Sequence, residues 1–209
     1  MSGIKETVFR YRDKIAVAFL LIVFICMASG IGTLGIGDLA EDRLDLLGYL
    51  VIAAGHTLRF LALRHIGPKS RTHTLGAPQL VTDGPYAVVR NPLYLANWII
   101  AIGLCLVAQL GWVLVAGPLL ALLLYYVVAL AEEPRLLAQF GEAYQRYCAT
   151  TPRFFPRLLL RKRGWRALWG SGATHSILRS KEYQAVLGSV CCVLLFELVE
   201  HLRRAKGLA

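Results

Sequence analysis

The feature that most constrains this chain is a long segment without charge. Residues 15–37 contain no charged side chain over 23 positions. A helix of about 20 apolar residues crosses the hydrocarbon core of a bilayer, which is about 30 Å thick. The segment therefore predicts a transmembrane helix. A signal peptide is the alternative interpretation, but the run is long and no small-residue cleavage site stands out.

Four further apolar runs occupy residues 46–63, 92–110, 112–131 and 183–199. The runs over residues 92–110 and 112–131, the third and fourth along the chain, meet at Gly111, which predicts a tight helical hairpin. Only 17% of the 209 residues are charged and 56% are hydrophobic, whereas a soluble domain has about a quarter charged residues. We therefore predict an all-α, polytopic integral membrane protein with about five transmembrane helices.

The charges between the runs differ from loop to loop. The N-terminal segment, the loop over residues 64–90 and the segment 132–182 are basic, whereas the loop over residues 38–45 is acidic. Basic loops face the cytoplasm in membrane proteins, which predicts a cytoplasmic N-terminus in a bacterial inner membrane or, alternatively, the endoplasmic reticulum. The net charge of +10 comes without a nucleic-acid-binding motif, so the expected partner of these charges is the bilayer with its anionic headgroups and not nucleic acid.

The last run does not fit this orientation. A spanning helix here would place the basic residues 203–206 outside. The run either spans against the rule, lies along the interface, or occupies a groove of a partner. We predict one domain over residues 1–209, in which residues 158–182 form a basic membrane-surface segment and residues 183–200 the last transmembrane helix.

The cysteines and histidines show no pattern of metal ligands. The five cysteines form no CxxC or Cys/His arrangement, and we interpret them as reduced packing residues. In the second run His56 and Arg59 lie three positions apart and share a helix face. Arg59 either binds an anionic group of a substrate or reaches the headgroups of the bilayer.

The first candidate motif ends the second loop and reads LVTDGPYAVVRNPLY. Gly84 breaks the chain, Asn91 is a good N-cap and Pro92 suits the first helical position. A helix N-terminus attracts anions, and Arg90 adds a full positive charge. The motif predicts a site for a carboxylate or phosphate, or simply a well-capped transmembrane helix.

The second candidate motif follows the fourth run. Glu132 and Glu133 are adjacent where a span leaves the bilayer, and they could accept hydrogen bonds from a ribose or face an ammonium or sulfonium centre. The alternative is a solvated helix start. One apolar and aromatic helix face follows, formed by Leu136, Leu137, Phe140, Tyr144 and Tyr147. Residues 151–157 then predict a short extended stretch that ends the helix.

Together the two motifs resemble a known family. The order LVTxGPYxxVRNPxY, a hydrophobic hairpin, then EExxLxxxFGxxYxxYxxxxxRFFP closely resembles the isoprenylcysteine carboxyl methyltransferase family, within a wider group that includes phospholipid N-methyltransferases. The resemblance covers residues 79–157, which it marks as a cofactor-binding core. It implies a helical membrane enzyme with a cytoplasmic pocket for S-adenosylmethionine. No GxGxxG after a predicted strand supports the soluble methyltransferase fold.

The resemblance also implies roles for individual residues. Glu133 and Arg153, with Arg59 added from the second run, are candidates for catalysis. The implied cofactor-binding residues are Tyr86, Arg90, Asn91, Tyr94, Glu132, Glu133, Tyr144 and Tyr147. Asn91 stands where the family usually has histidine, and it cannot titrate near neutrality.

These observations favour methyl transfer from S-adenosylmethionine to a lipophilic acceptor. The resemblance points to a carboxylate of an isoprenylcysteine-like compound, with a phospholipid or other lipid N- or S-methyltransferase as the alternative. From another class of protein, a noncatalytic membrane scaffold stays open. Cofactor-binding motifs do not identify the acceptor.

Overall fold

The computed structural model describes residues 2–66, 79–156 and 183–206. The predicted surface segment over residues 158–182 lies outside these ranges. In the described ranges the chain is helical, and its only strand-like feature is an isolated bridge between Thr33 and Leu110. The elements are α1 (Ser2–Ser29), α2 (Asp38–Ile66), the 3-10 turn η1 (Gly84–Ala87), α3 (Pro92–Ala108), α4 (Val113–Thr150) and α6 (Tyr183–Ala205). The prediction of an all-α membrane protein is confirmed.

Within the described ranges, three helices are long and apolar enough to cross a membrane by length and composition. These are α2, α4 and α6, whereas α3 is apolar but has only 17 residues. The helix α1 is not among these three, and it stops at Ser29, so the prediction of a first span over residues 15–37 was wrong. The loop that follows contains glycines with positive φ, beginning with Gly30 at 70°. Glycine adopts this conformation readily and is a poor helix former, so an uncharged run need not be a continuous helix.

Small residues let α2 and α3 pack closely side by side in opposite directions. A Cβ atom added to Gly48 would lie 2.9 Å from the carbonyl oxygen of Gly103, and one added to Gly55 would lie 3.0 Å from that of Ala96. Close backbone approach at small residues is the usual way in which helices associate in lipid. The contact places the C-terminal half of α2, including Arg59, beside the start of α3.

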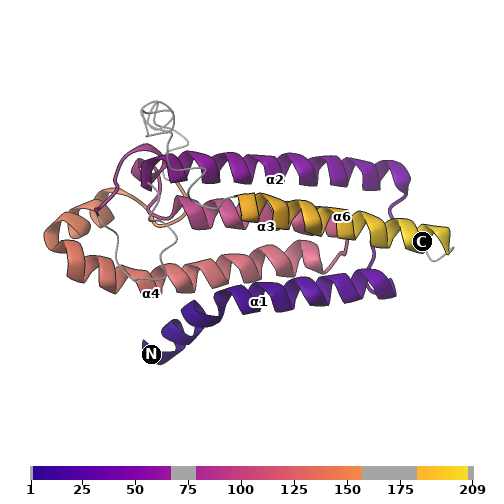
Figure 1. The fold of residues 1–209 in the computed structure, drawn as a ribbon, viewed down its shortest axis with the longest axis horizontal. Helices are drawn as coiled ribbons and strands as arrows, with labels where there is room; N and C mark the ends of the chain where they lie inside the picture. The colour runs from indigo at the N-terminus through magenta and orange to yellow at the C-terminus, as the bar shows by residue number, and fades with distance from the viewer. Residues whose placement is uncertain (1, 67–78, 157–182, 207–209) are drawn as a thin grey trace.

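The helix α4 is longer than the predicted run and bends sharply. It continues through Glu132 and Glu133 to Thr150, but Gly141 has non-helical angles of φ 51° and ψ −128°. After Gly141 the chain turns back, and the last part of α4 returns toward the start of α3 (Figure 1). We call the parts before and after Gly141 the outer arm and the return arm. The predicted hairpin between α3 and α4 is present, with Gln109 in the left-handed conformation at the turn.

The helix α6 runs beside α2 in the opposite direction. Nε2 of His56 lies 3.1 Å from Oγ of Ser189, and further along the hydroxyl of Tyr49 donates to Glu197. Phe196 packs into the apolar core with residues of α1, α2 and α3. These contacts place α6 lengthwise in the bundle, as expected of a transmembrane helix.

The basic end of α6 meets the acidic first turn of α2, which the sequence had placed in a loop. Nη2 of Arg204 lies 2.8 Å from a carboxylate oxygen of Glu41, and the same side chain contacts Glu200 and Asp38. One of the positive charges that conflict with the predicted orientation, that of Arg204, is therefore paired within the protein. The orientation itself stays a prediction.

Candidate functional site

Backbone hydrogen bonds join the two sequence motifs at one end of the bundle. The amide of Arg90 donates to the carbonyl of Pro152 at 2.8 Å, and the amide of Asn91 donates to that of Arg153 at 3.2 Å. The N-cap prediction was right for the position of Asn91 but wrong for its side chain, which makes no capping bond. Its Nδ2 instead donates to the same Arg153 carbonyl at 3.2 Å, so this residue joins the motifs. Pro92 starts the helix as predicted.

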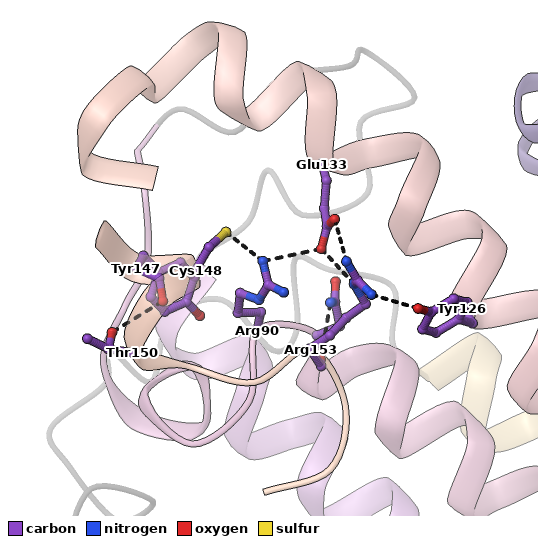
Figure 2. Close-up of polar contacts among 8 residues, drawn as sticks. Arg90, Tyr126, Glu133, Tyr147, Cys148, Thr150 and Arg153 are labelled. Atoms are coloured by element: carbon purple, nitrogen blue, oxygen red, sulfur yellow. Dashed lines mark hydrogen bonds and ion pairs between the residues drawn. The ribbon is translucent and has the colours of Figure 1, made fainter. Parts of the chain in front are cut away.

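The carboxylate of Glu133 holds two arginines together. Nε and Nη2 of Arg153 each lie 2.7 Å from one of its oxygens, and Nη1 of Arg90 lies 3.3 Å from Oε1 (Figure 2). Such bidentate, charge-assisted pairs are strong and fix geometry. The hydrogen bond to Glu133 raises the pKa of Arg153 above its ordinary value, so its guanidinium stays charged. Arg153 also donates to the hydroxyl of Tyr126 at 2.9 Å.

The return arm of α4 completes this cluster from the opposite side. Nη1 of Arg90 also contacts the sulfur of Cys148 (Figure 2). The hydroxyl of Tyr147 donates to the carbonyl of Tyr86 at 2.7 Å. Tyr144 is buried beside Tyr147, with the ring centroids 6.3 Å apart. The interpretation of every cysteine as a packing residue was therefore wrong for Cys148, whose sulfur accepts a bond from an arginine.

The neighbouring carboxylate, Glu132, belongs to a second cluster. It accepts a hydrogen bond of 2.6 Å from the hydroxyl of Tyr94, whose ring stacks on Tyr125 with centroids 5.6 Å apart. Arg59 of α2 lies nearby and donates to the side-chain oxygen of Asn97. Its charge acts on Tyr125 as well. The site thus draws on α2, α3 and both arms of α4.

Sequence reasoning missed three residues of these clusters, namely Tyr125, Tyr126 and Asn97. A signal for the two tyrosines was present, because each precedes one of the paired glutamates by seven residues and so shares its helix face. Asn97 is an amide within an apolar run, three residues after Tyr94, and that combination also marks a polar face.

Two buried polar atoms in this region find no hydrogen-bond partner among the described residues. They are the hydroxyl of Tyr86 and Nε of Arg90. The Tyr86 side chain is only 7% exposed, and its burial raises its pKa well above the ordinary value, so the hydroxyl stays a neutral donor. Buried donors are almost always satisfied in folded proteins. An oxygen-rich ligand, such as one carrying a carboxylate and ribose hydroxyls, fits these donors.

In the part of the chain that the structure describes, no group of three or more His, Cys, Asp or Glu side chains is arranged to hold a metal ion.

Comparison with known proteins gives one family and two similar proteins. The family described as phospholipid methyltransferase matches residues 44–143. The cobalt-zinc-cadmium resistance protein CzcN of Cupriavidus metallidurans is 30% identical over 154 residues, which cover 73% of this chain and 68% of that protein. The nickel-cobalt-cadmium resistance protein NccN of Alcaligenes xylosoxydans xylosoxydans is 38% identical over 82 residues, covering 39% of this chain and 38% of that protein.

The match to NccN therefore spans well under two thirds of that relative's length. No solved structure matches the chain. The matched family segment runs from α2 to the first residues of the return arm and leaves out α1 and α6.

Proposed function

The chain belongs to the phospholipid methyltransferase family, and we propose that it uses S-adenosylmethionine to methylate a lipophilic acceptor. The family supports a membrane methyltransferase. The use of S-adenosylmethionine and the chemical class of the acceptor are proposals that we base on the residues of the site.

The observation that carries the proposal is the pair of unsatisfied buried donors, the Tyr86 hydroxyl and Nε of Arg90. They lie in the two motifs' shared cluster, between residues that could hold the carboxylate and ribose of the cofactor. In this proposal Arg90 binds the carboxylate, while Glu132 and Glu133 accept hydrogen bonds from ribose hydroxyls or the ammonium group. Tyr86, Asn91, Tyr94, Tyr144 and Tyr147 shape the same pocket. When bound, S-adenosylmethionine supplies an electrophilic methyl group on a sulfonium centre.

The charges of the site favour an anionic acceptor. Arginines outnumber carboxylates among the residues that interact here. Arg90 and Arg153 contact Glu133, and the charge of Arg59 acts on the neighbouring Tyr86 and Tyr125. A carboxylate acceptor is already ionised at neutral pH and needs no general base. The protein then has to align the two reactants and exclude water. Arg59 of α2 donates a hydrogen bond to Asn97 of α3. In this proposal its guanidinium binds the acceptor carboxylate.

We therefore propose a carboxylate of an isoprenylcysteine-like compound as the acceptor. The second candidate is the amine of a phospholipid, which the family description favours. An amine must lose a proton before it attacks, and Glu132 or Glu133 could accept that proton.

The cofactor part of the proposal is tested by calorimetry on the full chain in nanodiscs. We expect S-adenosylmethionine to bind the wild type and Arg204→Ala, in which an arginine is removed at the opposite end of the bundle. We expect no binding to Arg90→Ala. Equal binding to Arg90→Ala and Arg204→Ala would show that the site assignment is wrong. No binding to a folded wild-type sample would favour the noncatalytic scaffold.

The acceptor is tested with a labelled methyl donor. We expect label in N-acetyl-S-farnesylcysteine as an ester that releases methanol in base. Label in phosphatidylethanolamine that resists base would instead identify the amine. Glu133→Gln serves as the inactive control in both assays.

A further inference from the structure

Two arginines from different helices meet around the ring of Phe9. Cζ of Arg12 lies 4.4 Å from the ring centroid, and Cζ of Arg135 lies 5.6 Å from it. Phe9 and Arg12 belong to α1, whereas Arg135 belongs to the outer arm of α4, two residues after Glu133. Both distances are in the range of cation–π contacts. The ring therefore holds two guanidinium groups near one place, although they repel each other.

The local carboxylates leave this place positively charged. Arg12 lies 3.7 Å from Asp13, whose side chain is 83% exposed and hydrated. Both arginines also act on Glu132, which already accepts the hydroxyl of Tyr94. Arg59 acts on Tyr125 in the same cluster as Arg12. The sequence around Phe9 is itself basic, because residues 5–14 hold four basic and two acidic side chains, so an additional anion would be attracted here.

The depth of the two arginines is that of lipid headgroups. Arg12 precedes the first apolar run by three residues, and Arg135 follows the run that ends at residue 131 by four. Arginines at such positions reach the interface. Apolar side chains next to them, Ile15 and Leu137, are 43% and 41% exposed and so are free to contact acyl or prenyl chains.

We propose that Arg12 and Arg135 form a binding site for the oxyanion headgroup of a lipophilic molecule, either a phosphate or a carboxylate. The site opens beside Glu132 and Tyr94, so it would hold the acceptor's headgroup at the entrance of the methyl-transfer site. In this respect it rests on the proposed function. It also assigns a role to α1, which lies outside the matched family segment.

The test measures lipid retention by native mass spectrometry of the detergent-purified full chain. The probes are phosphatidic acid, oleate and inorganic phosphate, which separate a lipid phosphate, a lipid carboxylate and a free phosphate. The variants are Arg12→Gln, Arg135→Gln and the double variant. Arg10→Gln is the matched control, because Arg10 is exposed on the same helix at nearly the same depth. Arg12→Lys keeps the charge and guards against a purely structural effect.

We expect each single variant to retain an anionic lipid about fivefold less well and the double variant about 25-fold less well, on the basis of the usual contribution of one interfacial arginine. Arg12→Lys should retain it nearly as well as the wild type. If the variants retain less phosphatidic acid, the headgroup is a phosphate; if they retain less oleate, it is a carboxylate.

Three results would overturn the site. The double variant could retain lipid like the wild type, Arg10→Gln could weaken retention as much as Arg12→Gln, or inorganic phosphate could displace the lipid at equal concentration. S-adenosylmethionine binding is measured in parallel and should be unchanged in all five variants. Lipid retention does not require methyl transfer, so a failure of the proposed function in the wild type is recognised separately from a failure of this site.

Discussion

The two ends of the helical bundle both carry charged clusters, but their composition differs. At the far end, where α6 stops, Arg204 faces Glu41, Glu200 and Asp38. At the site end Glu133 alone holds Arg90 and Arg153. Carboxylates are in excess at one end and arginines at the other.

The two ends also differ in how completely their polar groups are satisfied. At the far end Gln109 donates both to the backbone of Glu41 and to the carboxylate of Asp45. Near the site, the Tyr86 hydroxyl and Nε of Arg90 find no partner within the described ranges. A structural cluster satisfies its own members, whereas a binding cluster keeps donors for its ligand. We therefore interpret the far end as a structural cluster that fixes α6 in the bundle, and the site end as a binding site.

Removal of the central carboxylate is the strongest test of this comparison. Glu133→Gln would leave Arg90 and Arg153 without their shared counter-ion. Breaking a largely buried ion pair costs about 3 kcal/mol or more, so methyl transfer and cofactor affinity should fall by about 100-fold. The matched change is Glu41→Gln, because both carboxylates are mostly buried and each contacts an arginine. It should leave both readouts unchanged in a labelled-methyl assay and in calorimetry.

The reversal at Gly141 is the next test, because it brings the return arm to the site. Gly141→Ala adds a Cβ atom that meets no other atom, so its whole effect comes from the backbone conformation at φ 51°. We expect a loss of stability of about 1–3 kcal/mol together with weaker cofactor binding. Gly188→Ala is the control, since it also has open space but lies within the helix α6. There alanine should be neutral or stabilise by up to about 1 kcal/mol. Thermal unfolding of both variants that gave equal shifts would contradict a special role for the turn.

A conservative change distinguishes the two arginine clusters more finely. Arg153→Lys keeps the charge but cannot make the two parallel bonds to Glu133. We expect about a tenfold loss of methyl transfer, which corresponds to about 1.4 kcal/mol. Arg204→Lys should have wild-type activity. If both lysine variants behaved alike, geometry at Glu133 would not matter and charge alone would explain the cluster.

The sequence predicted the parts of this architecture that depend on local pattern. The helical membrane fold and the hairpin at Gly111 follow from apolar runs and turn residues, whereas the meeting of the two motifs was implied by the family resemblance. Arg90, Glu133 and Arg153 do come into contact. Their roles in binding and catalysis stay proposals.

Features that depend on distant contacts were not predictable in the same way. Cys148 reaches Arg90 only because Gly141 reverses α4, and Asn97 meets Arg59 only because small residues bring α2 and α3 together. Asn91 has the right residue type for a helix cap, but a carbonyl from the other motif engages its side chain. In each case a tertiary contact decides what a local preference leaves open.

The smallest expected effect concerns the far end itself. Arg204→Gln removes three ion pairs, but its side chain is 39% exposed and the attraction is screened by water and salt. We expect a loss of stability of about 0.5–1 kcal/mol in thermal unfolding at low salt, which shrinks further at high salt, and no change in cofactor affinity. The carboxylates left behind are partly hydrated, so their repulsion should be modest. A loss as large as that of Glu133→Gln, or one that removed cofactor binding, would mean that the position of α6 supports the site. The far end would then contribute to cofactor binding and would not be only a structural cluster.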